Sequence, residues 1–159
     1  MVPSSGNHVT RTIRIAARPE TVFAFFTDPA KMCLWKGTAA ELDPRPGGLY
    51  RVNATGRDIA RGEYVEIVPH ARIVFTWGWE QGGNQLVPPG SSTVEITLRP
   101  DGDGTVLQLT HRDLPEGQRA GHDEGWAHYL ARLEAAAAGR NPGPDSWAVS
   151  PAQHPTASR

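Results

Sequence analysis

The residues best suited to chemistry are a few polar side chains placed among apolar ones on predicted strands. His111 closes one such strand, 105–112, and histidine is the side chain whose ordinary pKa suits proton transfer near neutrality. Arg61 and Glu63 lie two apart in a second strand, 59–68, so they share one face of it. They could form an ion pair, anchor a ligand or, for Glu63, act as a general base. His111 and Glu63 are therefore the candidate catalytic residues, each with a purely structural alternative.

Aromatic side chains form a second group of candidates. Trp77 and Trp79 share a face of the predicted strand 71–79, and Trp126 begins the apolar stripe of the last predicted helix. An apolar wall with a few convergent polar groups is typical of a small-molecule site, although large rings also fill the core of any small domain. The candidate ligand-binding residues are Phe25, Trp35, Arg61, Glu63, Phe75, Trp77, Trp79, Leu109, His111, Trp126 and Leu130.

Other kinds of catalytic site lack their usual residues. His111, His122 and His128 are separated by 11 and 6 positions, and neither spacing places two metal ligands on one helix face. The sequence contains no serine nucleophile elbow, no phosphate-binding glycine loop and no cysteine pair. We therefore expect neither a metal nor a cofactor.

Composition excludes several classes of partner. The 159 residues carry 16 basic and 17 acidic side chains, a net charge of -1, with no basic run that would favour nucleic acid. Cys33 is the single cysteine, so no disulfide can form within the chain. A run of about 18 apolar residues is absent, and residues 1–8 lack the features of a signal peptide. We expect a cytoplasmic protein that does not insert into membranes.

The elements expected to position the candidates are, in order, one strand, short helices, six strands and one long helix. Pro19 suits the first turn of a short helix that stops near Asp28-Pro29, and a second helical turn is expected over 30–35. A long helix is expected over about 115–138, because Trp126, Leu130, Leu133 and Ala137 recur at spacings of 4, 3 and 4. Strands are expected at 9–16, 38–43, 48–54, 59–68, 71–79, 92–99 and 105–112, joined by short turns and hence antiparallel.

This order predicts an α+β helix-grip fold, in which a curved antiparallel sheet wraps around the long C-terminal helix and encloses space. The expected domain spans 9–138, preceded by a flexible N-terminus, 1–8, and followed by a disordered tail, 139–159, rich in Pro, Ser and Ala. Trp147 in that tail could dock on the domain or on a neighbouring subunit.

Several segments also resemble a known family. The segments that carry the resemblance are Pro-Glu-Thr-Val-Phe-Ala-Phe-Phe-Thr-Asp-Pro (19–29), Trp35, Pro-Gly-Gly (46–48), Gly-Glu-Tyr-Val-Glu-Ile-Val-Pro (62–69), Arg-Ile-Val-Phe-Thr-Trp-Gly-Trp (72–79), Ser-Thr-Val-Glu-Ile-Thr-Leu (92–98), Gly-Thr-Val-Leu-Gln-Leu-Thr-His (104–111) and Gly-Trp (125–126). Together they resemble the heat-shock-protein-90 ATPase activator homologues, a bacterial-rich branch of the START-like, Bet v 1-like (SRPBCC) superfamily. The resemblance implies the helix-grip fold. It leaves function open, because such relatives include carriers, cyclases and co-chaperone domains.

Three hypotheses of function follow. The first is binding of a hydrophobic or aromatic small molecule in the cavity between sheet and helix. The second is a cofactor-independent cyclase, dehydratase or hydrolase that uses His111 or Glu63. The third is a co-chaperone-like or other protein-interaction role, including a homodimer.

Overall fold

The computed structural model describes residues 8–80 and 86–148. Predictions for residues 1–7 and 149–159 lie outside this part of the chain. The strands are β1 Val9–Ile15, β2 Ala39–Leu42, β3 Leu49–Asn53, β4 Ile59–Val68, β5 Arg72–Trp77, β6 Ser92–Asp101 and β7 Gly104–Arg112, and the helices are α1 Pro19–Thr27, α2 Pro29–Met32 and α3 Arg119–Ala137. The predicted order of elements is confirmed.

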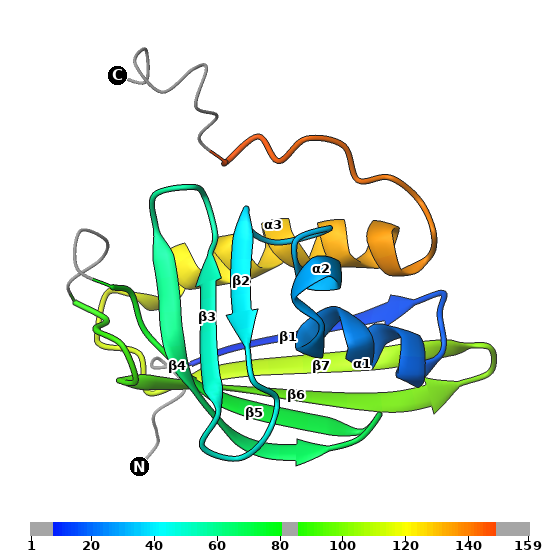
Figure 1. Ribbon diagram of the computed structural model, residues 1–159, viewed down its shortest axis with the longest axis horizontal. Coiled ribbons are helices and arrows are strands. Elements are labelled where there is room, and N and C mark those ends of the chain that lie inside the picture. The colour runs from blue at the N-terminus through cyan, green and yellow to red at the C-terminus, as the bar shows by residue number, and fades with distance from the viewer. Residues whose placement is uncertain (1–7, 81–85, 149–159) are drawn as a thin grey trace.

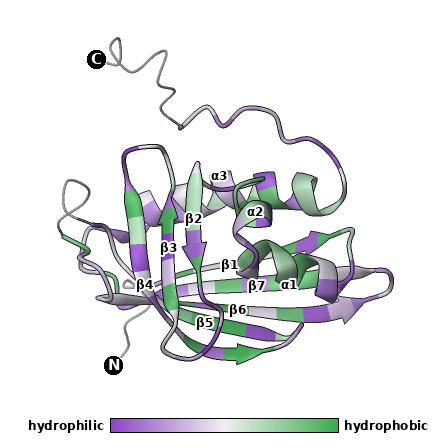
Figure 2. Cartoon of the chain, in the orientation of Figure 1, coloured by the Kyte–Doolittle hydropathy of each residue, from purple (hydrophilic) through white to green (hydrophobic). Residues whose placement is uncertain are grey.

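The seven described strands form one antiparallel sheet in the order β1-β7-β6-β5-β4-β3-β2. The sheet curves strongly, α3 lies along its inner side, and α1 and α2 lie toward one end (Figure 1). Apolar and polar residues alternate along several strands, which gives the sheet an apolar face for the helices to cover (Figure 2). This is the helix-grip fold that the sequence predicts.

Local sequence explains how the elements begin and end. Pro19 and Pro29 occupy first turns of α1 and α2, and the Asp28 side chain accepts a hydrogen bond from the Ala30 amide at the start of α2. The last helix begins at Arg119, four residues later than predicted. The reason is a turn in which the Gln118 amide donates to the Pro115 carbonyl and Gly117 adopts φ +88°, a conformation that no helix contains.

Strand β5 ends at Trp77, two residues before the predicted limit. Gly78 lies so close to the segment that follows that a Cβ atom there would be 1.7 Å from the Pro88 carbonyl oxygen. The chain leaves the regular ladder at this point, and Trp79 keeps a single bridge to Ala60. The two tryptophans are therefore presented from a bend at the end of the strand.

Candidate functional site

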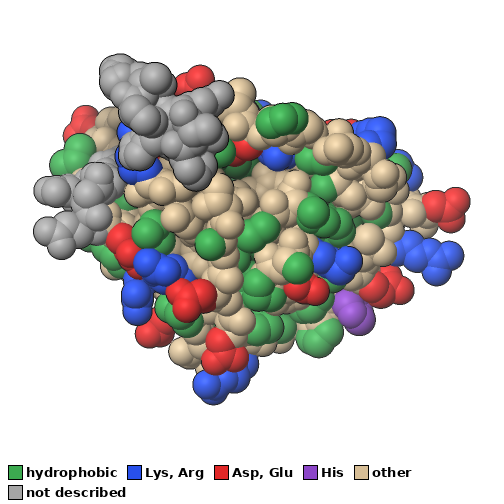
Figure 3. Space-filling view, turned by 45° about the horizontal axis from the view of Figure 1, so that its top comes forward, with side chains coloured by type: hydrophobic (Ala, Val, Ile, Leu, Met, Phe, Trp, Pro, Cys, Tyr) green, Lys and Arg blue, Asp and Glu red, His purple; other side chains and the backbone are tan. Residues whose placement is uncertain are grey.

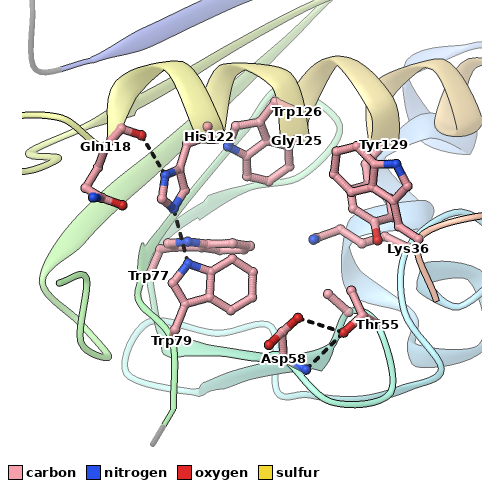
Figure 4. Close-up of a pocket in the computed structure, with 13 residues that line it drawn as sticks. Lys36, Thr55, Asp58, Trp77, Trp79, Gln118, His122, Gly125, Trp126 and Tyr129 are labelled. Carbon is pink, nitrogen blue, oxygen red and sulfur yellow. Dashed lines mark hydrogen bonds between the residues drawn. The ribbon is translucent and has the colours of Figure 1, made fainter. Parts of the chain in front are cut away.

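A cavity of about 360 Å³ lies between α3 and the end of the sheet (Figure 4). Its wall comes from five parts of the chain: the loop between α2 and β2, the β3–β4 turn, the end of β5, the first half of α3 and the segment after α3. The lining is mostly aromatic with a few polar groups and glycines: Lys36, Ala54, Thr55, Asp58, Trp77, Trp79, Gln118, Gly121, His122, Gly125, Trp126, Tyr129 and Trp147.

Helix α3 turns a separate stripe of residues toward the cavity. Gln118, His122, Gly125 and Tyr129 recur at spacings of 4, 3 and 4, beside the parallel stripe that begins at Trp126 and packs into the core. Glycine makes room here, because a Cβ atom on Gly125 would meet only the Trp147 ring, at 3.9 Å. Gly125 thus faces the cavity.

The tryptophan wall is braced by a histidine. The Trp77 ring lies 5.3 Å from the rings of both Trp79 and Trp126. The Trp79 indole N–H donates to His122 Nε2 over 3.1 Å, so His122 Nδ1 carries the proton and donates to the Gln118 carbonyl, 2.8 Å away. Burial and the nearby Lys36 ammonium lower the pKa of His122, although its bond to Gln118 acts in the opposite direction. A neutral histidine thus fixes the orientation of Trp79.

Lys36 extends into the middle of the cavity (Figure 4). Only 3% of this residue is exposed, and within residues 8–80 and 86–148 its amine contacts no carboxylate at ion-pair distance. The ammonium lies instead over three aromatic rings, 5.0 Å from the centre of Trp77, 5.4 Å from Trp126 and 4.3 Å from Tyr129. Burial lowers the pKa of Lys36 to about 7, with a smaller opposing effect of the Asp145 carboxylate.

Neighbouring residues hold Lys36 in this position. The Trp35 ring is buried in the core, where its indole N–H donates to the Phe25 carbonyl, and Arg132 of α3 donates to the Trp35 carbonyl, both over 3.0 Å. Gly37 then turns the chain with φ +99° and lies against the Asn53 carbonyl, at a distance that leaves no room for a Cβ atom. The lysine side chain is therefore directed inward by a fixed backbone.

The segment after α3 supplies one wall. The Trp147 ring stacks on His128 with centroids 4.0 Å apart and planes 2° apart, and Asp145 Oδ1 accepts from His128 Nε2 and from the Trp147 amide. The Tyr129 hydroxyl and Asp145 Oδ2 are buried without a hydrogen-bond partner in the described part of the chain. The sequence left the docking of Trp147 open, and the structure places this ring on α3 of its own domain.

His111 is fully buried behind the tryptophans and does not line the cavity. Its Nδ1 accepts from the Trp126 indole N–H at 3.0 Å, so its Nε2 carries the proton and donates to Ser92 Oγ at 2.8 Å, while Ser92 donates to the Trp77 carbonyl. Burial, with smaller effects of His122 and Lys36, lowers the pKa of His111 to about 3. Both ring nitrogens of His111 are hydrogen-bonded, so this candidate catalytic residue has no free donor or acceptor for a molecule in the cavity.

Arg61 and Glu63, both candidate ligand-binding residues, do not line the cavity. Strand β4 buries Ala60, Gly62 and Tyr64 and exposes both charged residues on the outer face. The alternation that groups them with Ile67 fails because a β-bulge shifts the register of β4 and β5 between Tyr64 and Glu66. Arg61 pairs with Glu80 at 3.4 Å rather than with Glu63.

The other predicted residues divide between cavity and core. Trp77, Trp79 and Trp126 line the cavity, as expected of a ligand-binding wall. The remaining apolar candidates lie in the hydrophobic core: Phe25, Trp35, Phe75, Leu109 and Leu130.

The cavity's polar groups, above all Lys36, Asp58 and His122, were not predicted. For His122 alone, the second stripe on α3 was the signal available in the sequence, because Gln118, His122, Gly125 and Tyr129 share helical spacing.

Residues 8–80 and 86–148 contain neither a membrane-spanning helix nor a cluster of metal ligands. No helix there is both long and apolar enough to cross a membrane. No group of three His, Cys, Asp or Glu residues lies close enough to hold a metal ion in that same part.

The family model and the solved structures that match this chain point to the same family. The sequence model of the family described as activator of Hsp90 ATPase homolog 1-like protein matches residues 16–138. No curated protein matches the chain. The solution structure of an AHSA1-like protein from Rhizobium etli is 53% identical, with a TM-score of 0.71 over 90% of this chain and 89% of that one.

Two more distant structures share the fold. An HSP90 activator from Plasmodium falciparum is 25% identical, with a TM-score of 0.68 over 82% of this chain and 96% of that one. The Aha1 dimer from Colwellia psychrerythraea is 17% identical, with a TM-score of 0.69 over 82% of this chain and 95% of that one, a likeness of fold alone.

Proposed function

We propose that this chain, which belongs to the family of activator of Hsp90 ATPase homolog 1-like proteins, binds an apolar small molecule in the cavity between the sheet and α3. The cavity wall carries this proposal, because four of the chain's five tryptophans line it. Its volume of about 360 Å³ falls in the range of ligand pockets, roughly 300–1,000 Å³. A compact aromatic molecule of about the size of naphthalene suits such a space.

Glycine on α3 supports the same proposal. A Cβ atom on Gly121 would have open space around it within 4 Å, although alanine at this position would favour the helix by roughly 1 kcal/mol. The helix thus keeps a residue that is unfavourable for its own stability and that leaves the cavity open. A structural role alone gives no reason for this choice.

The neutral fluorescent dye N-phenyl-1-naphthylamine tests the proposal. We expect the dye to bind with energy transfer from the tryptophans, and Gly121→Leu to weaken binding at least tenfold because the leucine fills the cavity. The stability of this variant should not fall, since leucine is a better helix former than glycine. Ala131→Leu, at an exposed position of the same helix, is the matched control. Absence of dye binding, or equal binding by wild type and Gly121→Leu, would overturn the proposal.

A second candidate function is an interaction with another protein. It is supported by the similarity to the Plasmodium falciparum structure, whose description is that of an HSP90 activator. On the face shown in Figure 3, hydrophobic side chains lie in small separate groups among acidic and basic ones, which fits a transient contact better than a permanent one. Sedimentation velocity over a range of concentrations, with and without an Hsp90 homologue, tests this function and the possible homodimer. A monomer that forms no complex would exclude both.

A further inference from the structure

Lys36 places a buried cation beside the cavity, and no carboxylate of the described residues lies at ion-pair distance from it, although Asp145 acts on it from further away. A charged side chain inside a protein normally has a counter-ion, because burial without one is costly. Here the three surrounding rings contribute only their negative π faces, at 4.3 to 5.4 Å. The amine therefore has hydrogen-bonding capacity that the described residues leave unused.

The two nearby carboxylates each accept hydrogen bonds from other groups, although Asp145 Oδ2 has no partner in the described part of the chain. Asp58 accepts from the Thr55 hydroxyl at 3.0 Å, and Asp145 Oδ1 accepts from His128 and from the Trp147 amide. Neither aspartate forms an ion pair with Lys36. Both ring nitrogens of His122 also have hydrogen-bond partners, the Trp79 indole N–H and the Gln118 carbonyl. Among the described residues that line the cavity, Lys36 is thus the cation with an open direction toward a bound molecule.

We infer that the ligand of this cavity is an acid, a flat apolar molecule whose anionic oxygen, a carboxylate or a phenolate, is bound by the Lys36 ammonium. The apolar body of such a molecule would lie against Trp77, Trp79 and Trp126, and its charged end would point toward Lys36. Each part of the ligand would then meet a surface of matching polarity, and the lysine would gain its missing partner. This inference rests on the proposed function, because it assigns the chemical class of the molecule that the same cavity holds.

Three naphthalene derivatives of similar shape test the charge directly. Isothermal titration at pH 6.5 compares 2-naphthoate, its neutral isostere 2-naphthamide and the cation 2-naphthylmethylammonium. We expect 2-naphthoate to bind at least tenfold more tightly than 2-naphthamide, because it forms a charge-assisted hydrogen bond in a buried site. The cation should bind most weakly, since it meets Lys36.

Variants of Lys36 assign the effect to this residue. Lys36→Met should reduce the affinity for 2-naphthoate at least tenfold and leave that for 2-naphthamide nearly unchanged. Lys36→Gln, which keeps a donor without the charge, should give the same pattern and guards against a fold defect peculiar to one variant. Lys31→Met is the matched control, because Lys31 is the chain's other lysine and is exposed.

The outcomes separate this inference from the proposed function. Equal affinities for naphthoate and naphthamide, or an acid preference that survives in Lys36→Met, would overturn the inference. If N-phenyl-1-naphthylamine or the amide still binds in that case, the proposed function stands. If none of these compounds binds, both fail.

Discussion

Methionine in place of Lys36 removes a buried charge and keeps nearly the same side-chain length, so its effect on folding can be estimated from the surroundings of the amine. A fall of the pKa from 10.5 to about 7 corresponds to about 5 kcal/mol, at about 1.4 kcal/mol per tenfold change. The three aromatic rings offset roughly 0.5–1 kcal/mol each. We therefore expect the free energy of unfolding of Lys36→Met to be about 3 kcal/mol higher than that of wild type at pH 7 or below.

The pH dependence gives the sign of this effect. Below pH 7 the amine is charged in the folded and the unfolded protein, so the full cost of burial is present. Between pH 7 and 10.5 the folded protein loses the proton first, the unfolded chain binds more protons, and wild-type stability rises with pH. The advantage of Lys36→Met should therefore shrink as the pH approaches 10.

Urea unfolding of ligand-free wild type, Lys36→Met and Lys31→Met at intervals from pH 6 to pH 10 measures this difference. Because the chain has two lysines, NMR of their side chains can also follow the titration of each amine directly. A Lys36→Met variant less stable than wild type at pH 7, or an advantage that stays constant up to pH 10, would refute the reasoning.

Three further predictions concern other parts of the site. Trp147→Ala should weaken binding of N-phenyl-1-naphthylamine several-fold and lower stability by less than about 1 kcal/mol, because the ring is 41% exposed and packs mainly on His128; unchanged dye affinity would count against a role in the wall. His111→Leu should cost about 2–3 kcal/mol at pH 7, since the Trp126 indole N–H loses its acceptor. The stability difference between this variant and wild type should become smaller in urea unfolding between pH 6.5 and 4, because the unfolded wild type binds a proton at His111 there and the folded protein does not. A stability difference independent of pH would contradict a neutral His111 in the folded protein. Glu63→Gln should leave dye affinity unchanged and stability within about 0.5 kcal/mol, because Glu63 is on the exposed face, and a loss of binding would place it in the site after all.

Much of the fold was predictable because its signals are local. Alternation in 92–99 and 105–112 predicts the buried faces of β6 and β7 correctly, from Val94 to His111. The facing of β4 was not predictable in the same way, because Arg61 and Glu63 share parity with Ile59 and Val65. The structure has a β-bulge between Tyr64 and Glu66, which interrupts the alternation before Ile67, and the sequence pattern does not show it.

The site was only partly predictable, because its wall is assembled from distant segments. Trp77, Trp79 and Trp126 could be predicted from their residue type and spacing, and they do line the cavity. Lys36 gives no such sign: a lone lysine between Trp35 and Gly37 looks like a surface residue. Its inward direction depends on a buried tryptophan, on a glycine with positive φ and on Arg132 of a helix about a hundred residues away.

The cavity wall has two parts that differ in how freely their residues can change, and the docked segment that carries Trp147 is one of them. Trp77 and Trp126 belong also to the core, so a change in either disturbs folding as well as the cavity. Trp147 adds no ring to that core and is held on α3 by His128 and Asp145. Selection could therefore reshape the cavity through this segment, and adapt the protein to a ligand of another size, without reworking the sheet and helix that enclose it.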